Sequence, residues 1–441
     1  MNPIRWKLHW QIMLSLALAL VVGIGLRSAD AVGGDLGTQV IAACGFLGKL
    51  FMNALKMIVV PLIVSSIICG IMSLGSDRNF GRMGIKILVY YSLTGLCAIV
   101  VGLVLVNVIR PGLVDPETAD QILGQQEKSE AFTARFEGRG GGEMLEIFLR
   151  MLPPNIVKAA TDNGQLLGMI CFSLLFGYFI SRLPERLQAF QRDLWESVQS
   201  VMMMITNLII RFAPIGVFGL VTPIILRTGF EVFVPLFWFV LTVFLALAFH
   251  VFVTLGLLLK FVGGVNPWKH FKTMAPVLLT AFSTASSAST LPVTLEVTER
   301  DAGVSNRTAG FTLPLGATVN MDGTALYECV VVIFIAQFYG VLQGFEIGIT
   351  TQFTVVLLAL MTSVGVAGIP SASLVAITVI LGVIGIDPSA VGLVWVTDRI
   401  LDMCRTAVNV YSDTCGAVII GRTEGEKTIY AGSEAGIISP N

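Results

Sequence analysis

The chain has 441 residues, of which 55% are hydrophobic and only 13% are charged, and its mean hydropathy is +0.82. A soluble globular chain carries about twice that charged fraction, so the composition excludes an ordinary soluble domain and predicts a polytopic membrane protein. The net charge of −1 gives no indication of a nucleic-acid surface. The seven cysteines and three histidines show no metal-like spacing, which favours buried thiols over disulfides, a zinc site or a catalytic histidine.

Apolar runs in the first 260 residues predict six membrane helices. The first covers about 9–26 and is retained, because no small-residue cleavage site follows its basic start. An acidic turn with Asp30 and Asp35 separates it from the second helix. Four of the other five helices are expected over 47–74, 87–109, 194–226 and 232–259. The remaining one, fourth in the chain, is broken at Pro153-Pro154 and Asn163-Gly164 and ends near residue 180.

The polar segments between these helices differ in charge. The longest, 111–143, is net acidic and is expected to be flexible. Basic residues cluster at the N-terminus, in the loop 77–86, in the loop 182–192 and after the sixth helix. This alternation follows the positive-inside rule and predicts that both termini are cytoplasmic.

Two interruptions by small polar residues mark the last third of the chain. Residues 283–290 are rich in Ser, Thr and Ala, and 362–373 combine Gly, Pro and Ser; an apolar helix with ionisable groups follows each, over 311–336 and 393–420. Loop charge places the first interruption on the cytoplasmic side and the second on the outer side. Irregular backbone at membrane depth is tolerated where it lines a cavity, so the pattern predicts an inverted repeat with two re-entrant hairpins. Two pairs of ordinary kinked helices are the alternative.

A polar stripe runs through the last of these helices. Asp402, Arg405, Asn409 and Asp413 are three, four and four residues apart, which places them on one helix face over roughly 16 Å. Charged groups at bilayer depth are costly and normally face a protein interior or a watery path. The stripe therefore predicts a binding surface for small charged solutes. An Asp402–Arg405 pair that only holds helices together is the alternative.

The segment Asn320-Met321-Asp322-Gly323-Thr324 predicts a cation site. Asn320 and Asp322 are two residues apart, so a regular helix would splay them, and Gly323 allows the helix to unwind there. Their oxygen atoms, together with free carbonyl groups, suit a hard cation. Further along the helix, Glu328 has no adjacent cation, and burial disfavours its charged form. We expect it to carry a proton or to be a neutral hydrogen-bonding core residue.

The charges of the stripe indicate the solute. Arg405 offers a planar fork that matches a carboxylate, and Asp402 can accept an ammonium group. Hydroxyl and amide groups of the hairpins, near helix N-termini, suit an α-carboxylate. The sequence therefore predicts a cation-coupled carrier of a small acidic amino acid or a dicarboxylate.

Over nearly its whole length the chain resembles the dicarboxylate/amino acid:cation symporter family, which includes the excitatory amino acid transporters and the archaeal aspartate transporters. The motifs that carry the resemblance are Ser286-Ser287-Ala288-Ser289-Thr290-Leu291-Pro292, Asn320 to Thr324, Gly365-Val366-Ala367-Gly368-Ile369-Pro370, and Asp398 to Asp413. One motif alone would be weak evidence, but the four together are specific.

The resemblance implies an all-α polytopic membrane protein with eight transmembrane helices, two re-entrant helical hairpins and inverted repeats. It implies a homotrimer that works as an elevator, with the second hairpin as the gate. The scaffold would comprise 1–80 (helices one and two) and 111–230 (the extracellular loop with helices four and five). The transport domain would comprise helix three in 81–110 and the region 231–421, which holds helices six to eight and both hairpins. A cytoplasmic tail would cover 422–441.

The resemblance also implies site residues. Arg405 would bind the side-chain carboxylate of the substrate and Asp402 its amino group. The other substrate contacts would be Ala285, Ser287, Thr324, Ile369, Ser373, Thr406 and Asn409. One sodium site would use Gly316, Asn320, Asn409 and Asp413. A second would use the carbonyl groups of Thr318, Ser363, Val364 and Val366. A third would use Tyr91, Thr94, Asn320 and Asp322.

Three departures from the family pattern concern ions and release. Gly95 stands where relatives have a hydroxyl residue, which removes one ligand of the third sodium site. Ala285 and Met403 occupy the two positions at which relatives carry an auxiliary arginine. Glu328 matches the proton-carrying glutamate of the mammalian carriers, so proton cotransport is implied and potassium countertransport stays open.

The leading hypothesis is uptake of glutamate or aspartate coupled to sodium and protons in a bacterial inner membrane. The alternatives are a C4-dicarboxylate:cation symporter, a proton-only glutamate symporter and a gated anion channel. A neutral amino acid carrier is disfavoured because Arg405 would then be an unpaired buried charge. An enzyme is disfavoured because the sequence has no nucleophile–base pair and no catalytic metal motif.

Overall fold

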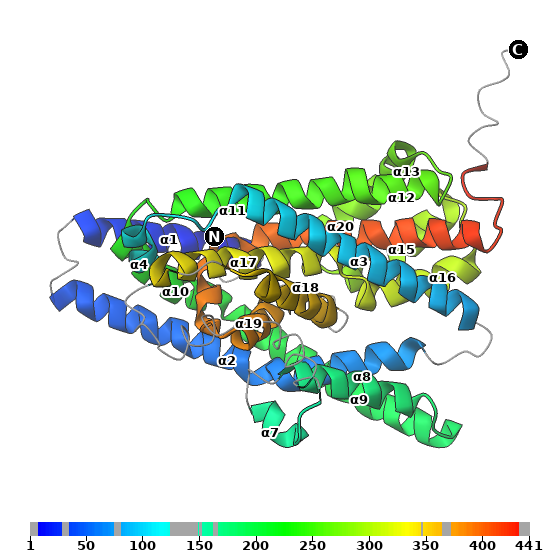
Figure 1. The fold of residues 1–441 in the computed structure, drawn as a ribbon, viewed down its shortest axis with the longest axis horizontal. Coiled ribbons are helices and arrows are strands. Elements are labelled where there is room, and N and C mark those ends of the chain that lie inside the picture. Colours follow the sequence, from blue (N-terminus) through cyan, green and yellow to red (C-terminus); the bar gives the residue numbers. More distant parts are fainter. Residues whose placement is uncertain are drawn as a thin grey trace, which may run out of the picture.

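In the computed structural model, the described residues are 8–28, 35–74, 81–123, 149, 152–161, 166–344, 347–363 and 372–431. Within them every element is a helix, and most helices lie along the long axis of the molecule (Figure 1). Four described helices are long and apolar enough to cross a membrane, or five if the bent pair α9 and α10 is one span. An all-helical membrane protein is therefore confirmed, and the count of eight spans stays a prediction.

The first helices are longer than the hydropathy pattern indicates. They are α1 (Leu8–Ser28), α2 (Asp35–Leu74), α3 (Gly81–Ile109), α4 (Pro116–Leu123), α7 (Ile156–Thr161) and α8 (Leu166–Ile180). The expected turn at Asp35 is wrong, because α2 begins at that residue and not near 47. The expected loop 77–86 is wrong from Gly81 onward, because α3 has already begun there. Helix ends are set by backbone capping as well as by hydropathy, so polar residues can extend a helix beyond its apolar run.

The middle of the chain contains a bent helix and a widened one. The elements are α9 (Glu185–Arg211), α10 (Ala213–Thr228), α11 (Phe233–Phe249), the π-helix η5 (His250–Leu255) and α12 (Gly256–Phe261). The helix expected over 194–226 begins earlier and bends by 51° between α9 and α10. Pro214 explains the break, because it lacks a backbone N–H and is accommodated in the first turn of a new helix. The helix expected over 232–259 is confirmed as α11 to α12.

Two helix–turn–helix units fall where the interruptions predict them. The first joins α14 (Ala275–Thr284) to α15 (Ser287–Arg300); the second joins α18 (Ile349–Ser363) to α19 (Ala372–Ile384) around 364–371, which lies outside the described residues. The remaining elements are α13 (Pro267–Thr273), α16 (Asn306–Val319), α17 (Asp322–Gln343), the 3-10 helix η6 (Pro388–Val394) and α20 (Trp395–Thr423). Asn320 and Met321 separate α16 from α17, which confirms a break in the predicted segment, but Gly323, where the unwinding was expected, already belongs to α17.

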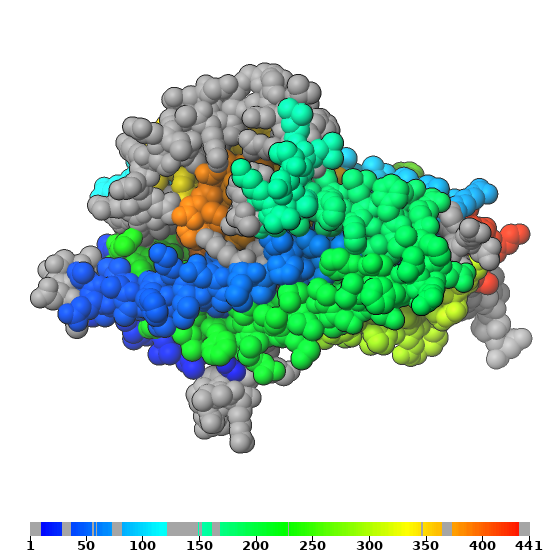
Figure 2. Space-filling view, turned by 90° about the horizontal axis from the view of Figure 1, so that it is seen from below, coloured from blue at the N-terminus to red at the C-terminus, as the bar shows by residue number. Residues whose placement is uncertain are grey.

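The core is centred on α17, whose residues from Asp322 to Gly340 are all buried. This helix packs against α3, α18 and α20, while α20 also packs against α14, α15 and α16. A second set of contacts joins α2 to α8, α9 and α10, and α10 to α1. Figure 2 shows α2, in blue, beside the green α9 and α10 on one face. The polar residues of α20 thus lie inside the helical core.

Candidate functional site

The polar stripe of α20 is buried as predicted. Asp402 is 6% exposed, Arg405 1%, Asn409 3% and Asp413 2%. All four lie on one helix of 29 residues, and the elements around them are α14, α15, α16 and α17. Groups of this polarity would be costly here without partners, so their contacts decide what the stripe can do.

Arg405 holds two carboxylates at once. Its Nη1 donates to Asp398 at 3.1 Å, and its Nη2 donates to Asp402 at 2.9 Å and to the hydroxyl of Ser373 at 2.8 Å. The guanidinium carbon lies 3.8 Å from the ring centroid of Tyr327, a cation–π distance. The Asp402–Arg405 pair therefore forms, and Arg405 also links α20 to α17 and α19. Asp398 was not among the expected site residues, although it lies on the same helix face seven positions earlier.

Asp402 lies between two arginines. Besides Arg405, Arg399 approaches it, with 3.6 Å between Arg399 Nη1 and Asp402 Oδ2. Two carboxylates and two guanidinium groups therefore form a cluster without net charge. A ligand carboxylate can take the place of an aspartate at Arg405 or bind its Nε–H group, which has no hydrogen-bond partner in the described chain, and a ligand ammonium can take the place of an arginine at Asp402. The cluster can consequently exchange internal ion pairs for pairs with a zwitterion that carries a second carboxylate.

Asn409 caps the N-terminus of α17. Its Oδ1 accepts hydrogen bonds from the backbone N–H groups of Gly323 at 2.8 Å and Thr324 at 3.3 Å, while its Nδ2 donates to the Thr324 hydroxyl at 3.0 Å. The first N–H groups of a helix have no partner within it, so this side chain from α20 supplies one. A Cβ at Gly323 would lie 2.8 Å from the carbonyl oxygen of Arg405. The unwound turn is thus fitted closely against α20.

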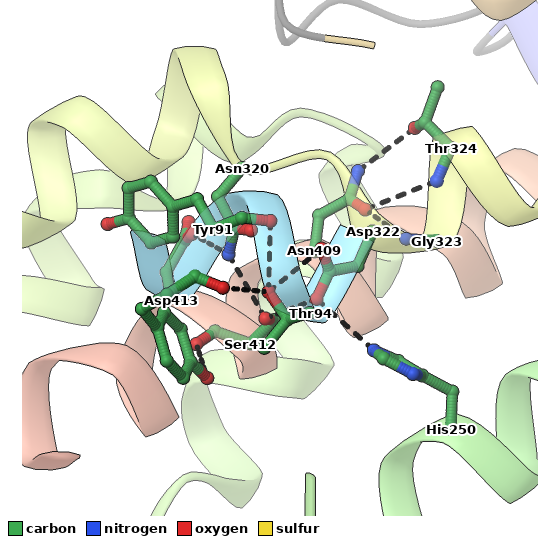
Figure 3. A network of polar contacts seen from close by, with 11 residues as sticks. Tyr91, Thr94, His250, Asn320, Asp322, Gly323, Thr324, Asn409, Ser412 and Asp413 are labelled. Carbon is green, nitrogen blue, oxygen red and sulfur yellow. Dashed lines mark hydrogen bonds and ion pairs between the residues drawn. The ribbon is translucent and has the colours of Figure 1, made fainter. Parts of the chain in front are cut away.

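Two buried carboxylates face each other across that turn (Figure 3). Asn320 Nδ2 donates to Asp413 at 2.8 Å and to the Ser412 hydroxyl at 3.0 Å, and Ser412 Oγ donates to Asp322 at 2.6 Å. Thr94 Oγ1 donates to the other oxygen of Asp322 at 3.3 Å. Within the described residues, neither carboxylate pairs with a lysine or arginine. In the part of the chain that the structure describes, the buried Oδ1 of Asn320 has no hydrogen-bond partner.

This arrangement fits a hard cation. Two carboxylates and an amide oxygen without a partner provide the oxygen ligands and the negative charge that such an ion needs. A Cβ at Gly316 would lie 2.3 Å from an oxygen of Asp413 and 2.8 Å from the hydroxyl of Tyr91. Only glycine leaves room there for the Asp413 carboxylate. The structure thus brings together the residues expected for the first and third sodium sites, except that Asn409 is engaged at the start of α17.

The second expected sodium site is described only in part. Val364 and Val366 lie outside the described residues, as does Ile369 of the expected substrate set. The hydroxyl groups of Thr318 and Ser363 donate to carbonyl groups of their own helices, those of Leu315 and Leu360. This site therefore stays a prediction.

The first hairpin turns next to the stripe. Ala285 adopts a left-handed backbone conformation with φ of 49°, and Ser287 begins α15 and is buried. Both α14 and α15 pack against α20. The Thr406 hydroxyl donates to the carbonyl oxygen of Asp402 at 2.8 Å. These residues lie on elements that surround the stripe, as the motifs predict.

Glu328 is fully buried on α17 and bonds to the second helix–turn–helix unit. Its Oε2 accepts a hydrogen bond from Thr362 of α18 at 2.7 Å, and its Oε1 has no partner among the residues that the structure describes. An acid with one free oxygen can hold a proton there without losing the bond to Thr362. The geometry agrees both with a proton carrier and with a neutral core acid.

Sequence reasoning missed several residues of the network: Asp398, Arg399, Tyr327, Ser412 and His250. Asp398 and Arg399 were detectable, because they lie one or two helical turns from Asp402 and Arg405. His250 comes from a span far away in sequence, and its only signal was a lone imidazole in an apolar run.

Comparisons with known proteins agree with this geometry. The family model described as "Sodium:dicarboxylate symporter family" matches residues 8–423. The chain is 33% identical over 424 residues to the "Proton/sodium-glutamate symport protein" of Geobacillus stearothermophilus, covering 95% of both proteins. It is 33% identical over 428 residues to the "Proton/glutamate-aspartate symporter" of Escherichia coli (strain K12), covering 96% of this chain and 94% of that protein.

A mammalian relative matches over a similar length. The chain is 32% identical over 473 residues to "Excitatory amino acid transporter 3" of Mus musculus, covering 98% of this chain and 89% of that protein. The family match spans most of the chain, and these relatives are transporters and not enzymes. The chain therefore belongs to the sodium:dicarboxylate symporter family.

Proposed function

We propose that this protein is a secondary active symporter that takes up glutamate or aspartate together with sodium ions and protons. The observation that carries the proposal is the pair of buried carboxylates, Asp322 and Asp413, without a lysine or arginine partner in the described chain. Two carboxylates at membrane depth stay charged only where cations neutralise them. Relatives named as proton/sodium-glutamate and proton/glutamate-aspartate symporters support the same cargo and coupling ions.

Sodium binding is assigned to the unwound turn between α16 and α17. Asp413, Asn320 and Gly316 would hold one ion together with Asn409. Asp322 and Asn320 would hold another with Tyr91 and Thr94, and a further ion would bind at Thr318, Ser363, Val364 and Val366. The Asn320 amide oxygen without a partner supports the first two assignments.

Substrate binding is assigned to the charge cluster beside this turn. Arg405 would exchange Asp398 or Asp402 for the side-chain carboxylate of the substrate, and Asp402 would exchange Arg399 for the amino group. Each exchange keeps Arg405 and Asp402 paired, and it releases Asp398 or Arg399 from its present partner. The other contacts would come from Ala285, Ser287, Thr324, Ile369, Ser373, Thr406 and Asn409.

Proton coupling is assigned to Glu328. Its bond to Thr362 connects the acid to α18, the first helix of the second hairpin. Protonation of Glu328 would therefore influence the element that we expect to act as the gate. Whether potassium is transported in the opposite direction stays open.

The larger organisation follows the family expectation. We assign α1, α2, α7, α8, α9 and α10 to a scaffold of a homotrimer, and α3 with α11 to α20 to a moving transport domain. The contacts among α1, α2, α8, α9 and α10, and those of α17 and α20 with α3 and α14 to α18, support this division. The proposed topology has eight spans and two re-entrant hairpins, with both termini cytoplasmic. We further propose that the transport domain moves as an elevator and that the protein lies in a bacterial inner membrane.

The test is uptake of radiolabelled aspartate and glutamate into proteoliposomes, with sodium, proton and potassium gradients imposed one at a time. Uptake that needs inward sodium and increases with acid outside supports the proposal. Uptake driven by protons alone would refute the assignment of these residues to sodium binding. No uptake of either amino acid under any gradient would refute the assignment of Asp402 and Arg405.

A C4-dicarboxylate symporter is the second candidate. The ion pair between Arg399 and Asp402 favours it, because Asp402 is then neutralised within the protein and needs no ligand ammonium. This candidate predicts succinate uptake, which an Asp402→Asn variant would keep. Full loss of amino acid uptake in that variant would favour the acidic amino acid instead.

A further inference from the structure

A histidine reaches the cation-binding turn from a distant span. His250 is fully buried, and its Nε2 lies 3.1 Å from Oδ2 of Asp322 (Figure 3). It is the first residue of η5, the π-helical segment between α11 and α12. An isolated polar side chain in such an apolar span costs free energy unless it has a partner, so the contact with Asp322 accounts for its presence.

The backbone around His250 also departs from regular geometry. The segment His250–Leu255 has π-helical hydrogen bonding in a span that is otherwise α-helical. Short π-helical segments inside α-helices are rare and are frequently found at functional sites. The helices on both sides of this segment pack against α20, as the segment itself does. The irregularity thus coincides with the residue that bonds to Asp322.

Asp322 receives hydrogen bonds from three different elements. Thr94 of α3 donates to Oδ1, while Ser412 of α20 and His250 of η5 contact Oδ2. Beside Thr94, the Cα of Gly95 faces the same carboxylate, since a Cβ there would lie 3.5 Å from Oδ1. Glycine supplies no donor at this position. The position of Oδ2 of Asp322 therefore depends on its hydrogen bonds with His250 and Ser412.

We propose that His250 is a positioning residue for sodium binding. Its Nε2–H group donates to Oδ2 of Asp322 and fixes the carboxylate, so that Oδ1 stays directed towards Thr94 and the cation. The imidazole thereby supplies a donor to this carboxylate in a chain in which position 95 supplies none. This inference rests on the proposed function, because it requires that uptake is coupled to sodium.

The first experiment compares His250→Leu with His250→Gln in proteoliposomes. The leucine has no donor, whereas the glutamine amide can still donate to Asp322. We expect the half-saturating sodium concentration to rise about tenfold in His250→Leu, the equivalent of one charge-assisted hydrogen bond, and to stay near the parent value in His250→Gln. The substrate KM at saturating sodium should stay unchanged in both. Thr242→Val is the control, because Thr242 is buried on the same span and bonds only to the carbonyl group of Trp238.

A rescue experiment tests the geometry directly. The Cβ of a residue at position 95 would meet only ordinary contacts of 3.4 and 3.5 Å, so serine and alanine both fit. In the His250→Leu background, Gly95→Ser should lower the half-saturating sodium concentration at least threefold, because its hydroxyl group can donate to Asp322. In the parent chain Gly95→Ser should lower it by less, since a hydroxyl group that acted only as a sodium ligand would lower it equally in both. Gly95→Ala in the same background should leave it high.

The outcomes separate this inference from the proposed function. Sodium-dependent wild-type uptake with an unchanged half-saturating concentration in His250→Leu would overturn the inference alone. Equal losses in His250→Leu and His250→Gln without rescue by Gly95→Ser would also overturn it, since they indicate a packing role. Wild-type uptake that ignores sodium would overturn both. If size-exclusion chromatography shows that His250→Leu does not fold, His250→Asn replaces it, because its shorter amide cannot reach Asp322.

Discussion

Replacing Glu328 by glutamine should uncouple uptake from the proton gradient. The carboxyl group bonds to Thr362 through one oxygen only, and its other oxygen is buried without a partner. The glutamine carbonyl group can accept the same bond from Thr362, and its NH₂ group fills the place of the second oxygen. The variant therefore keeps the volume and the contact with α18 but cannot gain or lose a proton.

The magnitude follows from the coupling of one proton. A difference of one pH unit carries about 1.4 kcal/mol per proton, which is a factor of about ten in an equilibrium ratio. At a fixed inward sodium gradient, acidifying the outside by one unit should raise the accumulation of aspartate about tenfold in the wild type. In Glu328→Gln the same change should leave accumulation unchanged. The assay is the steady-state level of radiolabelled aspartate in proteoliposomes.

The control is Glu296→Gln, the same chemical change on the exposed surface of α15, where Glu296 only pairs with Arg300. This variant should respond to pH as the wild type does. If Glu328→Gln responds to the pH gradient as strongly as the control, Glu328 is not the proton carrier. It would then be a neutral hydrogen-bonding residue of the core.

Three further outcomes are expected. Gly316→Ala should abolish sodium-dependent uptake in the same assay, because its Cβ would lie 2.3 Å from a carboxylate oxygen of Asp413. Asp402→Asn should lose aspartate uptake while any succinate uptake persists, which a two-substrate comparison measures. Glu426→Gln should lower the thermal unfolding midpoint in detergent by a few degrees. Burial raises the pKa of Glu426, but hydrogen bonds from Ser305 and from the Thr308 hydroxyl outweigh this effect and hold it below its ordinary value. The stabilisation is therefore present above pH 4.5 and is lost as the pH falls further, so the two midpoints should converge in acid.

The sequence predicted the parts of the fold that depend on local periodicity. The spacing of Asp402, Arg405, Asn409 and Asp413 placed them on one face of a helix, and the structure buries that face. The glycine after Asp322 indicated an unwound turn, which the structure places at Asn320 and Met321. These features are encoded within a few residues, so a single sequence is sufficient to predict them.

The contacts between distant segments could not be predicted in the same way. His250 and Asp322 are 72 positions apart, and only the packing of two helices brings their side chains together. Hydropathy also misplaced the starts of α2 and α9, because Asp35 and Glu185 extend these helices beyond the apolar runs. Even within α20, the periodicity indicated the pair of Arg405 with Asp402 but not its second pair with Asp398.

The arrangement of charges explains how sodium and substrate can be coupled within one helix. On one side of Asn409, the arginines and aspartates neutralise one another; on the other side, Asp413 and Asp322 lack a lysine or arginine partner in the described chain. Asn409 itself caps the start of α17, whose first turn adjoins both regions. A cation at the carboxylates would neutralise them and stabilise the unwound turn, which fixes Thr324 beside the substrate cluster. Because the two sites share this turn, each should increase the affinity of the other by the same factor. Sodium then strengthens substrate binding without contacting the substrate.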